Sequence, residues 1–321
     1  MKLIVKSLLF AGLLFFGLNV SAQTVSDAGN LYNQANQQFK NKAFGPAVKL
    51  YEQALQTCKM VGPDAMMLQS QVESQLAQAY FWNGISFYQK KQFDDAITQL
   101  QKSSKLAVKV NNTKFKGLAT TYTARVYASK GNTFLMQKKY AEAGAQYDAA
   151  LKVDPNSINA YFGKSLMAKE QKNLDEMAAM VTKVGMLVNT NSKGPQIYGQ
   201  ARQMAFGAFL NAGAVEIQKE NYNGALTDFS KAKEFYAGSA TLYYYIAVAN
   251  VKLKKWDAAI TNGKKALTME RNSKSDIYFT LGQAYQGKGL KTNACNEFKN
   301  VKSGPNVAAA KYQIKNVLKC K

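Results

Sequence analysis

Small and apolar residues recur along this chain at the spacing of paired helices. Within residues 131–155, Ala143, Tyr147 and Ala150 follow one another at gaps of four and three, which places them on one face of a helix. A two-lysine turn precedes this helix, and Pro155 ends it because proline cannot continue a helix. The residues before the turn carry an apolar face of their own. We therefore predict a pair of helices here, joined by a short turn.

The second-helix pattern is repeated in six further places. The copies lie at residues 44–54, 93–103, 174–184, 222–232, 256–266 and 294–301. Equivalent small positions in successive copies are 34 or 35 residues apart in three cases and 47 to 49 apart in the other three. The excess is about four helical turns, so we predict lengthened helices over 63–89, 113–137 and 195–219. The positions expected to pack the repeats together are Ala47, Ala96, Gly131, Ala143, Ala150, Pro155, Ala225, Ala259, Gly282 and Ala294.

The 34-residue helix-turn-helix unit resembles the tetratricopeptide repeat. The pattern is most specific in residues 127–155, good in 31–54 and 222–232, and degenerate in 174–184. The resemblance covers nearly all of the chain after residue 22. It implies an all-α fold, a right-handed superhelical solenoid of about seven helix pairs with a concave groove and a C-terminal capping helix.

Local composition suggests four segments. Residues 1–22 hold two lysines, a short apolar run and small residues at positions 20 and 22, as in a cleaved secretory signal peptide. Residues 189–195 have turn composition, so we place an N-terminal lobe of about four repeats at 23–190 and a C-terminal lobe of about three at 191–303. Residues 304–321 alternate an apolar and a lysine-rich face and form the expected cap.

The chemistry available to this chain is narrow. The sequence has no histidine and a formal net charge of +22. The lack of histidine excludes Ser-His-Asp and Cys-His catalysis and the two-histidine zinc motif. We expect no enzyme activity, no cofactor and no metal site. Nearly all of the basic charge is lysine, a flexible point charge that favours loose contact with anionic surfaces over base readout.

Export makes a disulfide bond possible. The chain has three cysteines. Cys295 and Cys320 lie on neighbouring elements near the end of the chain, and we pair these two. Cys58 is then left over as a small apolar residue.

The resemblance also implies a binding surface. In repeats of this kind, one residue of each first helix, three before the small site, points into the groove, and the residue four further on lies beside it. The groove candidates are Tyr32, Asn36, Phe81, Ile85, Asn132, Phe162, Leu166, Tyr244 and Phe279. Arg125 and Asn132 stand where the family's clamp for a terminal carboxylate falls, but the next copy has Phe162 and Leu166, so the clamp is incomplete. The alternative is that these rings pack as core, between adjacent repeats or against a long helix.

These features predict a non-catalytic protein–protein interaction scaffold of the bacterial cell envelope. The expected partner is a protein or peptide held in the concave groove, and the expected location is the periplasm or a loose association with the envelope. We expect no nucleic acid partner and no transmembrane span in the mature chain. Two alternatives stay open: a basic adapter for anionic envelope polymers, and a structural subunit of an envelope assembly or secretion machine.

Overall fold

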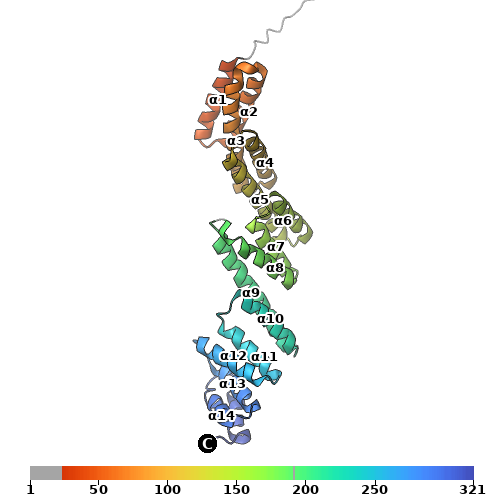
Figure 1. The fold of residues 1–321 in the computed structure, drawn as a ribbon, viewed down its shortest axis with the longest axis vertical. Coiled ribbons are helices and arrows are strands. Elements are labelled where there is room, and N and C mark those ends of the chain that lie inside the picture. Colours follow the sequence, from red (N-terminus) through yellow and green to blue (C-terminus); the bar gives the residue numbers. More distant parts are fainter. Residues whose placement is uncertain (1–23, 191) are drawn as a thin grey trace, which may run out of the picture. The chain divides into compact units, whose positions relative to one another are not determined.

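The structure, a computed structural model, describes residues 24–190 and 192–321 (Figure 1). The regular elements in these ranges are all helical. The predicted signal peptide at 1–22 lies outside the described residues. The chain divides into two compact units, unit 1 (Met1–Tyr122) and unit 2 (Thr123–Lys321), and each is described by itself.

Unit 1 is built from two helix pairs and the start of a third. Its elements are α1 (Val25–Lys40), α2 (Phe44–Val61), η1 (Pro63–Ala65), α3 (Met66–Gln89), α4 (Phe93–Lys109) and the first turns of α5 (Thr113–Met136). A capping box begins α1: the Thr24 hydroxyl accepts from the Asp27 backbone N–H, and the Asp27 carboxylate accepts from the Thr24 N–H. Small residues and Tyr51, Val72 and Leu76 form the core between α1, α2 and α3.

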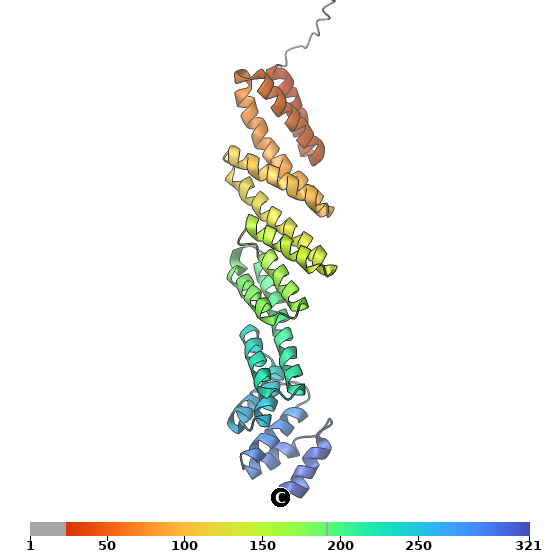
Figure 2. The ribbon, with the colours of Figure 1, turned by 90° about the vertical axis from the view of Figure 1, so that its right-hand side faces the viewer.

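Unit 2 continues the same architecture (Figure 2). After the rest of α5 it contains α6 (Tyr140–Val153), α7 (Ile158–Glu170), α8 (Leu174–Met186), η2 (Val188–Thr190), α9 (Gly194–Gln218), α10 (Tyr222–Phe235), α11 (Ala240–Lys252), α12 (Trp256–Met269), α13 (Ser275–Gly287) and α14 (Lys291–Lys299). The short helix α15 (Val307–Tyr312) and the π-helical turn η3 (Gln313–Val317) follow. Helices α7, α9, α11 and α13 each pack against the second helix of their own pair, and α8 with α9, α10 with α11 and α12 with α13 join successive pairs.

The predicted lengthened helices are present. Helices α3 and α5 have 24 residues each and α9 has 25, whereas the other first helices, α1, α7, α11 and α13, have 13 to 16. The longer spacing between copies therefore reflects extra turns at the beginning of these first helices. No additional helix pair is inserted within the described residues.

The turn inside each pair has a common geometry. In the described residues, the position two before each second helix has positive φ: Lys42, Lys91, Lys138, Lys172, Glu220, Lys254 and Gly289. At the central turn, the Lys138 N–H donates to the Leu135 carbonyl at 2.8 Å and the Lys139 N–H donates to the Phe134 carbonyl at 3.0 Å. These bonds satisfy carbonyls at the end of the first helix. Only glycine adopts this backbone conformation without strain. Six of the seven positions are not glycine, so each of these six turns carries a small conformational free-energy cost.

A tyrosine ring packed against two glycines links α5, α6 and α7. Tyr147 of α6 is fully buried. A Cβ atom built on Gly131 would lie 2.6 Å from the Tyr147 Cε1, and one built on Gly163 would lie 2.3 Å from the same atom. The ring therefore occupies the space that side chains at both positions would need. Its hydroxyl donates to the Asn132 Oδ1 at 2.7 Å, and burial raises the pKa of Tyr147.

The division between compact units differs from the predicted lobes. The sequence placed the break at 189–195, whereas the units divide after Tyr122, inside α5. Around 189–195 the core is continuous, because Val184 of α8 and Ala201 of α9 belong to one buried cluster. Gly194 explains the tight turn: a Cβ there would lie 1.8 Å from the Val188 carbonyl oxygen.

The C-terminal cap is fastened by a disulfide bond. Cys295 of α14 is bonded to Cys320, with their Cα atoms 5.8 Å apart, while Cys58 is buried and unbonded. Ala310 is buried against the last pair, and Ile314 and Leu318 pack beside it. The cap is shorter than predicted, because its regular helix ends at residue 312 and a π-helical turn follows.

Candidate functional site

The predicted groove candidates do not form an open aromatic stripe. Phe81 is 2% exposed, and its ring contacts Trp82, Phe115 and Tyr122 edge-on at centroid distances of 5.2, 5.5 and 5.4 Å. Phe81 is therefore a core residue of unit 1, and its assignment to a ligand-facing groove is wrong. The lengthened helices supply the reason, since the first turns of α5 bring Phe115 and Tyr122 onto this ring.

Two predicted amides already have partners inside their own helix pairs. The Asn36 Oδ1 accepts from the Tyr51 hydroxyl at 2.6 Å, as the Asn132 Oδ1 does from Tyr147. Burial raises the pKa of Tyr51 to about 12. These asparagines anchor buried tyrosines, so their amide oxygens are engaged before any ligand arrives. A ligand carboxylate only accepts hydrogen bonds, so a clamp would use the amide NH2 group of Asn132, which this bond leaves unused.

The other candidates are half-buried, and several of them pack against the cores of their own units. The Tyr32 ring lies 6.0 Å from Tyr51, and the Phe279 ring lies 5.6 Å from Phe298. Burial, and secondarily the Asp276 carboxylate, raise the pKa of Tyr244. Four further candidates are also half-buried, and Phe162 among them packs on the main core cluster of unit 2: Ile85, Arg125, Phe162 and Leu166.

One of these candidates, Ile85, lines an open hollow of 700 Å³ in unit 1. We call this the aromatic hollow. It is formed by the end of α1, the following turn, the start of α2 and one face of α3. Its lining residues are Phe39, Lys40, Lys42, Phe44, Trp82, Ile85, Ser86 and Gln89.

Three rings in contact form the apolar wall of the aromatic hollow. Phe44 stacks on Trp82 with centroids 6.0 Å apart and planes at 21°, and meets Phe39 edge-on at 5.5 Å. Trp82 is 41% exposed although it is held by Phe44 and Phe81. A large ring that is fixed in position and still accessible is a typical anchor for a bound side chain.

The polar part of the aromatic hollow is positive. Lys40 ends α1, Lys42 occupies the positive-φ turn position, and no acidic residue lines the hollow. Ser86 and Gln89 add neutral hydrogen-bonding groups one turn apart on α3. The site can therefore accept an apolar side chain from a partner and place a nearby carboxylate against lysine.

The sequence analysis did not single out the three rings Phe39, Phe44 and Trp82, because it chose Phe81 as the ring that faces the groove. The neighbouring Trp82 lies about 100° further around α3, and this rotation carries it to the surface. One of only two tryptophans in the chain, placed next to a core phenylalanine, was the available signal.

A second, smaller hollow lies in unit 2. It measures 470 Å³ and is lined by Gly199, Arg202, Gln203, Phe206, Phe235 and Tyr236. Arg202 donates through Nε and Nη2 to the Phe235 carbonyl, at 3.0 and 2.7 Å. Its guanidinium thus caps the end of α10, so this hollow has a structural arginine at its wall.

The described ranges were also searched for metal sites and membrane spans. Within residues 24–190 and 192–321, no group of three or more Cys, Asp and Glu side chains is placed to hold a metal ion. None of the helices described has the length and apolarity needed to cross a bilayer.

Comparison with known proteins supports the repeat assignment. Residues 124–157, which comprise α6 and the adjoining half of α5, match the tetratricopeptide repeat family. The Hsp70-Hsp90 organising protein of Plasmodium falciparum (isolate 3D7) is 26% identical over 143 residues, which are 44% of this chain and 18% of that protein. The matched segment therefore spans less than a fifth of this relative's length.

Solved structures of repeat proteins are similar at low identity. A tetratricopeptide repeat protein from Parabacteroides merdae ATCC 43184 is 15% identical, with 90% of this chain and 97% of that chain covered and a TM-score of 0.31. The TPR2AB domain of yeast Sti1, in its pHSP90 complex, is 15% identical, with 91% and 94% covered and a TM-score of 0.34. The matched segment contains Gly131 and Tyr147, whereas Gly163 lies just beyond it in α7. Residues 124–157 of this chain are thus a tetratricopeptide repeat.

Proposed function

We propose that this protein is a non-catalytic protein–protein interaction scaffold that holds an apolar segment of a partner in the aromatic hollow. The observation that carries the proposal is the exposure of Trp82, 41%, in a wall of three contacting rings. Exposed, immobilised aromatic residues dominate the energetics of protein interfaces. The lysines at the rim favour an acidic residue or a chain terminus next to the apolar anchor.

The relatives are compatible with such a role. The similar yeast domain is named for its pHSP90 complex, and the Plasmodium relative is named as an organiser of Hsp70 and Hsp90. We propose only the general role for this chain, the binding of a protein or peptide. The proposed site differs in one respect from the expectation based on sequence, because the anchor is Trp82 and not the buried Phe81.

We also propose that the protein works outside the cytoplasm, in the periplasm or loosely attached to the envelope. The support is the sequence of residues 1–22, with its two lysines and short apolar run. The Cys295–Cys320 bond fits an oxidising compartment. Fractionation of the producing cells, with N-terminal sequencing of the mature chain, tests this proposal. A chain recovered in the cytoplasm with Met1 intact would contradict it.

The binding proposal is tested by crosslinking in the native cells. The chain is tagged, crosslinked, captured, washed first at low and then at high salt, and its partners are identified by mass spectrometry. Trp82→Ala removes the anchor, and Tyr312→Ala removes another exposed aromatic residue, which is 57% exposed on α15. We expect one protein to survive the high-salt wash with the wild type and Tyr312→Ala and to be lost with Trp82→Ala.

A second candidate function is a basic adapter for anionic envelope polymers. The observation that favours it is that Lys occupies five of the strained positive-φ turn positions in the described residues, where glycine would cost least. Charge-driven binding weakens with ionic strength. If the captured material is polymer that washes off in high salt and Trp82→Ala has no effect, the adapter function replaces the scaffold.

A further inference from the structure

A second hollow in unit 1 has a different chemical character. It measures 460 Å³ and lies between α2, α3 and α4, and it shares no lining residue with the aromatic hollow. Its floor is aliphatic and its rim carries lysines, so we call it the lysine-rimmed hollow. The lining residues are Leu55, Leu76, Tyr80, Lys102, Lys105, Leu106, Val108 and Lys109.

The lysines form a row along one face of α4. Lys102, Lys105 and Lys109 are separated by three and four residues, so they lie on successive turns of the helix. The row extends about 10 Å along the axis. The side chains of Lys102 and Lys109 remain 48% and 56% exposed, and Lys105 is exposed as well.

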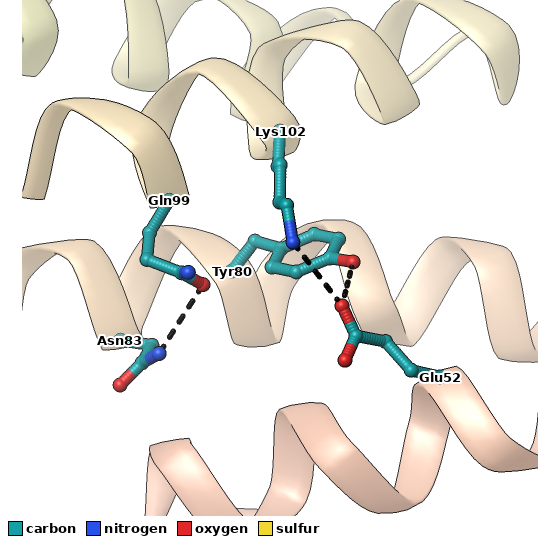
Figure 3. A network of polar contacts seen from close by, with 5 residues as sticks. All are labelled: Glu52, Tyr80, Asn83, Gln99 and Lys102. Atoms are coloured by element: carbon teal, nitrogen blue, oxygen red, sulfur yellow. Dashed lines mark hydrogen bonds and ion pairs between the residues drawn. The ribbon is translucent and has the colours of Figure 1, made fainter. Parts of the chain in front are cut away.

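Two carboxylates hold the ends of this row in place. Figure 3 shows the Tyr80 hydroxyl and the Lys102 Nζ meeting the Glu52 carboxylate, with the Lys102 Nζ above the Tyr80 ring. The Tyr80 hydroxyl donates to the Glu52 Oε1 at 2.5 Å, and the Lys102 Nζ lies 3.4 Å from the same oxygen. At the other end the buried Glu73 carboxylate pairs with the Lys109 Nζ at 2.5 Å. An ammonium group has three donors, so each tethered lysine keeps donors for a further anion.

The middle of the row is unpaired. Lys105 has no ion pair with any residue in the described ranges. Beside it, Val108 is 53% exposed, so the aliphatic floor continues onto the surface of α4. The result is an apolar strip bordered along its length by a regular series of positive charges.

We propose that the lysine-rimmed hollow docks an acidic amphipathic helix of a partner protein. Carboxylates on successive turns of that helix would meet the three lysines, and its aliphatic side chains would lie on Leu55, Leu76 and Leu106. The lysines repeat at helical spacing along α4, and carboxylates on successive turns of a partner helix would repeat at the same spacing. This agreement favours a helix as the occupant. A single-headgroup amphiphile would engage one lysine of the row and leave the other two unused.

A second copy of this chain is a poor occupant for the lysine-rimmed hollow. No helix in the described ranges carries carboxylates on three successive turns of one face. The chain as a whole has 42 Lys and Arg against 20 Asp and Glu, so two copies repel. The occupant is therefore expected from an acidic partner. This surface is separate from the aromatic hollow, and the proposal does not depend on the function assigned there.

The test uses two short labelled peptides and the full chain. One peptide is a helix former with glutamates on three successive turns and leucines beside them, and the other has lysines in place of the glutamates. Binding is followed by fluorescence anisotropy. Lys105→Glu reverses the middle charge, Val108→Asp interrupts the apolar strip, and Lys90→Glu is a matched exposed control outside the hollow. All three sites are exposed, so circular dichroism should show unchanged folding.

We expect the wild type to bind the acidic peptide and not the basic one. Lys105→Glu and Val108→Asp should each weaken binding at least about tenfold, because like charges at an interface cost several kcal/mol and a buried charge costs more. Lys90→Glu should bind as the wild type does. Equal affinity for both peptides, no binding of either, or full affinity of Lys105→Glu would overturn the proposal. Displacement of the acidic peptide by laurate at equal concentration would assign the hollow to a small amphiphile, and self-association abolished by Lys105→Glu would assign it to a second copy.

Discussion

The contact between Tyr147 and the glycines of α5 and α7 predicts that two glycine-to-alanine substitutions change the free energy of unfolding in opposite directions. Replacing a helical glycine with alanine ordinarily stabilises a helix by about 1 kcal/mol, because alanine loses less backbone entropy. Gly207 is exposed in α9, and a Cβ atom added there would meet nothing within 4 Å beyond its chain neighbours and the backbone of its own helix. Gly207→Ala should therefore stabilise the protein by about 0.5–1 kcal/mol.

Gly163→Ala should have the opposite effect. The added methyl would lie 2.3 Å from the Tyr147 Cε1. The ring has little room to move, because α5 packs on it so closely that a Cβ built on Gly131 would lie 2.6 Å from the same atom. Overpacking of a buried site costs about 1–3 kcal/mol, and the short distance places this case at the upper end. Alanine's more favourable helix propensity offsets part of this cost, so the free energy of unfolding should fall by about 1–2 kcal/mol in total.

Urea denaturation followed by circular dichroism measures both effects. With a slope of about 2 kcal/mol per molar urea, Gly163→Ala should lower the midpoint by about 0.5–1 M, and Gly207→Ala should raise it slightly. Tyr147→Leu removes the ring, and in that background the penalty of Gly163→Ala should shrink or vanish. If Gly163→Ala stabilises as much as Gly207→Ala does, the ring does not fill the space between the two helices and the packing argument is refuted.

Three further predictions concern the cap, the turns and pH. Reducing the Cys295–Cys320 bond, which spans 25 residues, should destabilise the cap by up to about 3.5 kcal/mol. Amide hydrogen exchange should then accelerate in α14 and η3. Unchanged protection of these amides would contradict a stabilising role for the bond. Lys138→Gly, at φ 59°, should raise the thermal midpoint, because it relieves about 1 kcal/mol of left-handed strain; a lower midpoint would show that the lysine side chain makes a compensating contact. Since burial raises the pKa of Tyr51 to about 12 from an ordinary value of 10.0, the neutral ring's contribution to stability is complete below pH 10 and is lost between pH 10 and 12. Thermal midpoints in this window should fall more steeply for the wild type than for Tyr51→Phe, and parallel curves would contradict the assignment.

The helical architecture could be predicted from the sequence because its cause is local and periodic. Small residues such as Ala143 and Ala150 recur at gaps of three and four, and only a helix places such positions on one face. The spacing between copies even located the lengthened helices, since extra residues without a turn signal extend an existing helix. The pairing of Cys295 with Cys320 followed from their places on neighbouring elements near the end of the chain, and the structure contains this bond.

The accessible surface could not be predicted in this way, because exposure depends on which neighbours cover a residue. Phe81 and Trp82 are adjacent in sequence, and helical spacing alone assigned the groove to the first of them. The lengthened α5 covers Phe81 with Phe115 and leaves Trp82 at the surface against Phe44.

The sequence by itself thus determined the helix pairs, their lengths and the small positions between them. Tertiary structure decided which rings, amides and lysines remain free to act. Asn132 illustrates the difference: its position in the first helix follows from the repeat, but only packing brings the Tyr147 hydroxyl to its oxygen. Periodicity is a property of one segment, whereas exposure and hydrogen-bond partners depend on contacts between segments far apart in the chain.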